Sequence, residues 1–464
     1  MTYPIAEFCA DVGDVPHATD AMTIRKKSRD QFAVSPLLRQ SLAGRVADVV
    51  VSPRSKDDVL TIIKAAVRHR IPLTARGGGT ANYGQSVPLQ GGILLDMTGL
   101  SGIVSISEGN VRALSGTCMA DIDLAAREKG WEMRIHPSTR SVSSIAGFVA
   151  GGSGGMGSCQ WGMLRDRGNI TAMEVVSVEA EPRFVELRGR DVELVHHAYG
   201  TNAIITEVEM PTTPAWTWKE VIVAFPEFLA ASRFGVQLAS EPAITKKLIS
   251  LQEWPVARLM TALGDIVPDG HTMVNCMIAA PTLDAFRGLV DDFGGSIVHE
   301  SLEGEGFYGA PIYEFAYGHG LRQIQKSQPT YTGLQGMFPA DDLLPTIERV
   351  HAAWRGTAPL RMEVFLSQGE VVTMGSPGIV YENEAQMAAI VAKLQGFGVK
   401  VANSHTTGVR EVGIKQFDDR DAVFKRSMDP HKLLNPGKLD FDDIPSSDSR
   451  SSLPTQGWSF RKAG

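Results

Sequence analysis

The chain has 464 residues, of which 43% are hydrophobic and 21% are charged. This composition is typical of a folded protein of two or three domains and excludes a disordered or fibrous chain. A formal net charge of −7 disfavours nucleic acid and anionic membranes, which bind basic faces, so we expect a small molecule or another protein as partner.

Residues 1–44 form an N-terminal segment that begins MTYPIAEFCADVGD. This stretch lacks the basic start and apolar core of a signal peptide, and no part of the chain is long and apolar enough to span a bilayer. The four cysteines, Cys9, Cys118, Cys159 and Cys276, lie far apart without a CxxC pair, which disfavours a zinc site and a disulfide framework. We expect a cytoplasmic protein without a bound metal.

The first clear elements follow residue 50. Ser55 with Asp58 is a capping-box signature, and the apolar spacing after it predicts a helix over 56–70. IPLTA then predicts a buried strand that runs directly into RGGGTANYGQ, and GILLDM predicts the next strand.

The loop ARGGGTANYG predicts a phosphate-binding site. Three consecutive glycines remove every Cβ, so backbone N–H groups can converge on an anion, and Arg76 and Thr80 add a charge and a hydroxyl. The alternative is a tight turn, although a turn usually needs only one or two glycines. A pyrophosphate is the expected ligand.

A second glycine loop, GFVAGGSGGMGSCQWG, contains the spacing G-x-G-x-x-G at Gly152, Gly154 and Gly157. A dinucleotide fingerprint needs a strand before it and an uninterrupted helix after it. Here the preceding stretch is rich in Ser and Thr, and Gly162 and Gly168 interrupt the following one. The context therefore argues against a Rossmann loop for NAD, while a merely flexible loop is the simpler alternative.

The remaining elements of this region complete one α+β domain over residues 45–214. MADIDLAAREKG predicts an amphipathic helix closed by Gly130, MEVVSV and RFVELR predict a hairpin, and AIITEVEM predicts a strand that ends at Pro211. His196 and His197 are interpreted as structural residues on a helix of this domain.

A second domain is predicted over residues 215–426. Strands such as KEVIVAF, MVNCMIAA and LRMEVFLS alternate with helices over 282–293, 341–354 and 383–396. Their alternating faces predict an antiparallel sheet covered by helices on one side.

Candidate catalytic residues lie in this second domain. The stretch YEFAYGHGLRQIQKSQPTY contains Tyr317 and His319, and a histidine is a natural base near neutral pH. Arg361 and Glu363 are two apart in a strand and so share a face, where Arg361 could hold a carboxylate and Glu363 could orient the substrate or act as base. His405 follows in a turn. The alternatives are cap packing for the aromatic stretch and a solvent-facing ion pair for the strand.

The motifs together resemble the FAD-binding domain of the vanillyl-alcohol oxidase and p-cresol methylhydroxylase (PCMH) superfamily. The resemblance covers 45–214 and resumes at DPHKLLNPGKL, within a segment over 427–444 that would return to the FAD domain; residues 445–464 would be a flexible tail. It implies an α+β fold with a PCMH-type FAD-binding domain of two α/β subdomains and a substrate domain, or cap. The FAD-binding residues that it implies are Arg76, Gly77, Gly78, Gly79, Thr80, Asn82, Pro137, Ser138, Ser144, Ile145, Gly147, Gly155, Ile205, Asn435 and Lys438.

The sequence departs from this pattern where some relatives tether FAD covalently. Thr80 stands in place of the tethering histidine and Leu164 in place of the tethering cysteine, so we expect dissociable FAD, with Cys159 as a minor alternative. The paired-histidine metal motif of the lactate and glycolate dehydrogenase branch is missing from the sequence, although the first glycine loop most resembles that branch.

The resemblance implies an FAD-dependent oxidoreductase that takes a hydride from a small alcohol or hydroxy acid onto the flavin N5 atom, with His319, His405 or Glu363 as base. Oxygen, a quinone or a protein would accept the electrons, and the sequence leaves the acceptor, the substrate and formation of a homo-oligomer open. The rival interpretation is a non-catalytic flavin-binding or interaction protein that kept the fold.

Overall fold

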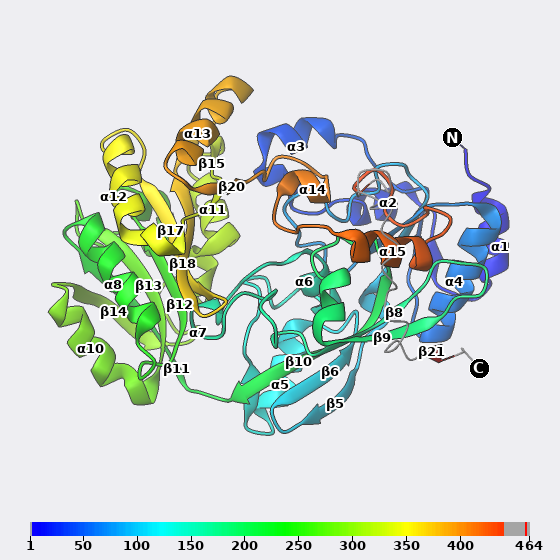
Figure 1. Ribbon diagram of the computed structural model, residues 1–464, viewed down its shortest axis with the longest axis horizontal. Helices are drawn as coiled ribbons and strands as arrows, with labels where there is room; N and C mark the ends of the chain where they lie inside the picture. Colours follow the sequence, from blue (N-terminus) through cyan, green and yellow to red (C-terminus); the bar gives the residue numbers. More distant parts are fainter. Residues whose placement is uncertain (1, 440–459, 462–464) are drawn as a thin grey trace.

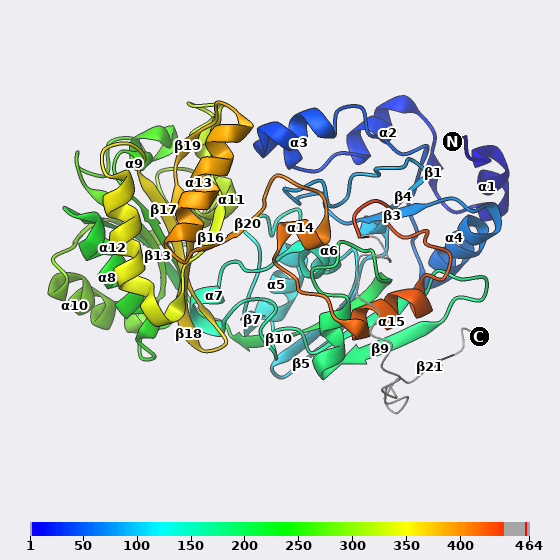
Figure 2. The same ribbon diagram turned by 45° about the horizontal axis from the view of Figure 1, so that its top comes forward.

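The computed structural model describes residues 2–439 and 460–461. Two lobes lie side by side (Figures 1 and 2). The cap lobe contains residues 215–402, and the N-terminal lobe contains the residues before it together with 403–439. The chain thus leaves the N-terminal lobe once and returns to it.

A four-stranded sheet opens the N-terminal lobe, in the order β1-β2-β4-β3, with β2, β4 and β3 parallel. Its elements are α1 (Ile5–Val12), β1 (His17–Ala18), α2 (Ala21–Lys27), α3 (Pro36–Ser41), β2 (Val49–Val51), α4 (Lys56–His69), β3 (Leu73–Arg76) and β4 (Ile93–Asp96). The predicted helix over 56–70 is α4, and the hydroxyl of Ser55 accepts the N–H of Asp58 at 3.1 Å. The apolar face of α4 packs on β2, β3 and β4, so the first glycine loop leaves a rigid strand end.

A second, antiparallel sheet runs in the order β21-β9-β8-β10-β6-β5, and β7 pairs with the far end of β10. Its elements are β5 (Ile103–Ser107), β6 (Asn110–Leu114), α5 (Met119–Arg127), β7 (Trp131–Met133), α6 (Ile145–Gly151), α7 (Ser158–Trp161), β8 (Ala172–Val176), β9 (Phe184–Arg188), β10 (Ile204–Pro214) and β21 (Phe460–Arg461). The predicted hairpin is the antiparallel pair β8 and β9. Apart from residues 460–461, the tail predicted over 445–464 lies outside the described residues.

The cap lobe is built on an eight-stranded antiparallel sheet in the order β14-β11-β13-β12-β17-β18-β16-β20. Its strands are β11 (Trp218–Phe225), β12 (Lys246–Gln252), β13 (Thr272–Ala279), β14 (Ser296–Leu302), β16 (Gln335–Met337), β17 (Leu360–Ser367), β18 (Glu370–Pro377) and β20 (Lys400–Ala402). Its helices are α8 (Phe228–Ser240), α9 (Val256–Leu259), α10 (Leu283–Asp292), α11 (Tyr317–Gln325), α12 (Leu343–Trp354) and α13 (Glu384–Gly396), and a small ladder pairs β15 (Tyr331–Thr332) with β19 (Ile379–Val380).

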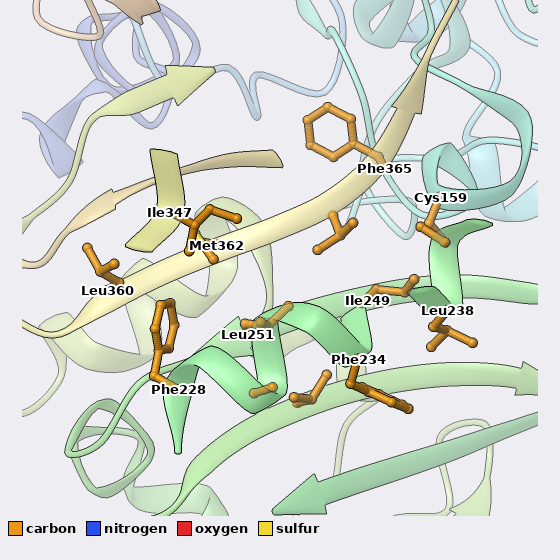
Figure 3. Close-up of a cluster of buried hydrophobic side chains, with 14 of the residues drawn as sticks. Cys159, Phe228, Phe234, Leu238, Ile249, Leu251, Ile347, Leu360, Met362 and Phe365 are labelled. Atoms are coloured by element: carbon orange, nitrogen blue, oxygen red, sulfur yellow. The ribbon is translucent and has the colours of Figure 1, made fainter. Parts of the chain in front are cut away.

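Both faces of the cap sheet are covered, whereas the sequence predicts cover on one side. Helices α8, α10, α12 and α13 pack on one face, where Phe234, Leu251 and Met362 lie in the largest apolar cluster (Figure 3). On the other face Met273 and Met277 pack against α9 and the chain over 308–324. This second layer includes part of α11 and stands between the sheet and the N-terminal lobe.

The chain returns to the N-terminal lobe through α14 (Val409–Val412) and α15 (Asp419–Met428). Phe424 and Met428 of α15 join the core under the second sheet. Beyond α15, Leu434 forms an isolated parallel bridge with Leu73 of β3, so the C-terminal segment extends the first sheet beside the glycine loop.

Candidate active site

The first glycine loop, residues 77–79, leaves β3 in a place that only glycine fits. A Cβ added at Gly77 would overlap the hydroxyl of Ser144, and one at Gly78 would overlap the carbonyl of Val142. At Gly79, where φ is +69°, it would overlap the guanidinium of Arg76. Close approach of bare backbone is what a pyrophosphate needs, so the residues present fit that part of FAD.

Three cavities connect from the glycine loop to the cap sheet. The first is lined by the glycine loop, Tyr199 and Ile205. The middle cavity shares Thr80 and Gly147 with the first, and the third shares Asn82 and Tyr317 with the middle one. A cofactor with a nucleotide at one end and a flat reactive ring at the other fits the shape of the first and middle cavities together.

Most of the predicted FAD-binding residues line these cavities. The first cavity contains Arg76, Gly77, Gly78, Gly79, Thr80, Ser144, Gly147 and Ile205, and the middle one contains Thr80, Asn82, Pro137, Ser138, Gly147 and Gly155. Ile145 lies in the core behind them. The hydroxyl of Ser144 accepts the N–H of Gly147 at 3.2 Å and so begins α6 at the cavity wall.

Asn435 and Lys438 stand behind the wall rather than in it. The buried ammonium of Lys438 donates to three carbonyls, those of Gly84, Gln85 and Val87, at 2.6–2.7 Å. The amide of Asn435 donates to the carbonyls of Gln85 and Tyr199. Gln85 and Tyr199 line the first cavity, so both C-terminal residues hold its wall in shape.

Arg361 and Glu363 both line the third cavity, as their two-residue spacing on β17 predicts. Glu363 is 8% exposed. Its Oε1 accepts the hydroxyl of Ser250 at 3.0 Å and the N–H of Tyr317 at 2.8 Å, while its Oε2 is buried without a hydrogen-bond partner among the described residues. Burial raises the pKa of Glu363 to about 7.

The guanidinium of Arg361 donates from Nε to Oε1 of Gln252 at 2.8 Å and from Nη2 to the carbonyl of Tyr317 at 3.3 Å. Both acceptors are neutral, and none of the ion pairs among the described residues involves Arg361. The structure therefore places a half-buried cation with spare N–H groups next to a buried carboxyl.

Tyr317 and His405 line the same cavity as this pair, and His319 lines the adjacent middle cavity. Tyr317 lines the middle and third cavities, and its hydroxyl donates to the carbonyl of Gly155 at 3.1 Å. His319 lines the middle cavity, with Nδ1 paired to Oε2 of Glu314 at 2.5 Å. His405 lines the third cavity with Nδ1 2.7 Å from the hydroxyl of Ser35, and burial lowers its pKa.

His197 lines the middle cavity. The sequence pattern favours a structural residue on a helix and does not predict this position. The segment 189–194 is a 3-10 helix, and His197 follows it with φ +50°. Its Nδ1 lies 2.9 Å from the carbonyl of Gly152, and burial lowers its pKa to about 4. The sequence holds no local signal for this turn.

Cys159 lies away from the three cavities. It is 1% exposed in the cap core, where α7 packs against β12 and β17 (Figure 3). Burial raises the pKa of its thiol to about 12. Thr80, in contrast, lines the first and middle cavities and has its hydroxyl 2.8 Å from that of Ser143.

The linked cavities, with the glycine loop at one end and the cap lobe at the other, fit a flavoprotein. Residues 47–182 match the family model described as FAD binding domain. The chain belongs to the FAD-linked oxidoreductases with a PCMH-type FAD-binding domain.

Relatives of known or suspected redox activity match different shares of the chain. An uncharacterised FAD-linked oxidoreductase of Mycobacterium tuberculosis is 25% identical over 94% of this chain and 99% of its own length. D-lactate dehydrogenase of Archaeoglobus fulgidus is 23% identical over 86% and 93%. Glycolate oxidase subunit GlcD of Bacillus subtilis is 28% identical over 40% of this chain and 41% of its own length. The matches favour an enzyme over the non-catalytic rival.

A solved structure of alkyldihydroxyacetonephosphate synthase shares the fold. It has a TM-score of 0.69 and covers 95% of this chain and 86% of its own, at 14% identity. No helix among the described residues could cross a membrane, and within the same ranges no group of three or more His, Cys, Asp or Glu side chains is placed to hold a metal ion.

Proposed function

We propose that the protein oxidises a small 2-hydroxy carboxylate to the corresponding 2-oxo acid, with dissociable FAD as hydride acceptor. The observation that carries the proposal is the pair Arg361 and Glu363 in the cavity that adjoins the middle one. A 2-hydroxy acid has an anion and a hydroxyl on adjacent carbons, so it needs a cation and a base side by side. D-lactate dehydrogenase and a glycolate oxidase subunit among the relatives support the same substrate class.

Arg361 would bind the substrate carboxylate. Its guanidinium is held by Gln252 and the carbonyl of Tyr317, so its direction is fixed before the substrate arrives. Charge-assisted bonds from arginine to carboxylate are strong and often paired, and burial strengthens them further. The substrate carboxylate would also neutralise the positive charge of Arg361, which burial disfavours.

Glu363 would take the hydroxyl proton. The N–H of Tyr317 and the hydroxyl of Ser250 fix Oε1, which leaves Oε2 to accept a proton from the substrate. A pKa of about 7 suits a general base at neutral pH, because the group is ionised in a large fraction of molecules and still binds a proton well. The chemistry that FAD supplies when bound is acceptance of the hydride at its N5 atom.

The two histidines are weaker candidates for the base. His319 lines the middle cavity only, and Glu314 holds its Nδ1. His405 shares the third cavity, but its Nδ1 is taken by Ser35, a residue of the N-terminal segment. We assign to His405 a role at the cavity wall, and to Tyr317 the positioning of Glu363 through its backbone N–H.

Anaerobic mixing of the purified holoenzyme with substrates tests the proposal. D-lactate, glycolate and D-2-hydroxyglutarate, each with its L enantiomer where one exists, are compared with neutral alcohols of similar size. We expect bleaching of the visible flavin bands by at least one hydroxy acid and by none of the alcohols. Bleaching by alcohols alone would overturn the assignment of Arg361 and the substrate class together.

A further inference from the structure

A separate groove opens beside the middle cavity. Its walls come from α7, the turn at 193–197, the β17–β18 hairpin and residues 414–421, and its volume is about 920 Å³. It shares His197 and Ile414 with the middle cavity and no lining residue with the third. It therefore adjoins the middle cavity on a side that does not include Arg361 and Glu363.

One layer of side chains separates this groove from the middle cavity. Besides the two shared residues, two pairs of consecutive residues have one member on each side. Gly162 lines the groove and Met163 lines the cavity, and Leu366 lines the groove and Phe365 lines the cavity. A ligand in the groove would thus lie one residue away from a flavin ring in the middle cavity.

The groove offers a flat aromatic surface beside the nitrogen-bearing side chains of His196 and Arg165. Trp161, 36% exposed, is covered on one side by the guanidinium of Arg134 at 4.7 Å from its ring centroid. His196 is 6% exposed, and its Nε2 is buried without a hydrogen-bond partner among the described residues. Arg165 lies exposed at the rim, where its Nη1 donates to the carbonyl of Ile414 at 3.3 Å.

The charges of the groove are largely paired within the protein, which disfavours an ionic ligand. Lys415 pairs with Asp421 at 3.0 Å, Arg420 with Asp191 at 2.6 Å and Arg167 with Glu193 at 3.0 Å. A neutral planar ligand with carbonyl oxygens matches the aromatic surface and the donors of His196 and Arg165.

We propose that this groove binds a quinone, the electron acceptor of the enzyme. The proposal deepens the function proposed above and rests on it for the source of electrons. In the complete reaction the 2-hydroxy acid loses two electrons and two protons and becomes the 2-oxo acid. The quinone gains both and becomes the hydroquinone, so no other oxidant is needed.

Binding of ubiquinone-1 to the oxidised holoenzyme provides the first test, because it needs neither turnover nor a substrate. Calorimetric titrations compare the wild type with Trp161→Ala, Arg165→Gln and the control Phe307→Ala. Phe307 is an aromatic residue, 56% exposed, that lines neither the groove nor the three cavities. We expect the Kd to rise about tenfold in Trp161→Ala, to rise in Arg165→Gln and to stay unchanged in the control.

Reoxidation of photochemically reduced enzyme by ubiquinone-1 provides the second test, and it is independent of the identity of the hydroxy acid. The quinone concentration that gives half the maximal rate should rise in both groove variants, while anaerobic reduction by the hydroxy acid stays as in the wild type. Equal binding and equal reoxidation in all four proteins would overturn the groove assignment. Reoxidation by oxygen or a protein alone, with no ubiquinone-1 bound, would overturn the proposal that a quinone is the electron acceptor.

Discussion

Replacement of Glu363 by Gln tests the proposed base without a change of shape. The amide carbonyl can still accept the hydroxyl of Ser250 and the N–H of Tyr317, but the side chain can no longer take a proton. General bases typically contribute 10²–10⁴-fold to a rate, so we expect flavin reduction by the hydroxy acid to slow by about that factor while substrate affinity changes little.

The pH dependence of the rate of flavin reduction provides a second test of Glu363 as the base. With a pKa of about 7, the ionised fraction of Glu363 rises about tenfold from about pH 6 to about pH 8. Stopped-flow reduction of the wild type should therefore accelerate by about that factor over this interval and then level off. The Glu363→Gln variant should lose this rise. An unchanged profile in the variant, or a fall of less than about threefold in its rate, would refute the assignment of the base.

Stability measurements separate this effect from misfolding. The native pKa of Glu363 is raised from 4.5 to about 7, so its contribution to stability is fully present below about pH 4.5 and is lost as the pH rises through 7. The loss corresponds to about 3 kcal/mol, and glutamine does not titrate. The variant should thus melt at a higher temperature than the wild type at about pH 8, with the difference closing below about pH 5.

Three further predictions concern the other parts of the site. Arg361→Gln should raise the KM for the hydroxy acid about 100-fold in steady-state assays; a loss confined to kcat would contradict its role in binding the carboxylate. Gly78→Ala should be purified without most of its FAD, because the new Cβ overlaps the carbonyl of Val142. The control Gly288→Ala on α10, where the new Cβ meets open space, should keep the visible flavin spectrum. Equal FAD content in the two variants would refute the role of the first glycine loop in binding FAD. Acid precipitation of the wild type and of Cys159→Ser should release the yellow colour to the supernatant, and colour that stays in the wild-type pellet would mean a covalent tether.

The sequence predicted best those features that depend on neighbouring residues. The helix at 56–69 begins where Ser55 stands, and the triple glycine lies at a strand end where every Cβ would collide. The spacing of Arg361 and Glu363 placed them on one face, as the structure has them. The spacing could not predict which face of the cap sheet the two residues share. The second layer over this sheet is formed by residues 308–324, whose packing on β12 and β13 has no local signature in the sequence.

Long-range contacts account for what the sequence missed. The side chain of His197 reaches the middle cavity because a turn with φ +50° follows a 3-10 helix, and the apolar spacing of that stretch favours an ordinary helix just as well. The resemblance at the C-terminal motif predicted that Lys438 returns to the cofactor, whereas the fold shows that its ammonium donates to the three carbonyls of residues 84, 85 and 87.

The hydrogen bonds of Lys438 to residues 84, 85 and 87 also bear on the order of folding during synthesis. The two partners are more than 350 residues apart in the chain, and the entire cap is synthesised between them. A nascent chain can complete the strands of the N-terminal lobe early, yet the wall of its first cavity stays unsupported until Lys438 leaves the ribosome, since such distant contacts form late. Cofactor capture is therefore expected only after Lys438 has been synthesised, and a fragment that ends before residue 434 should fold without retaining FAD.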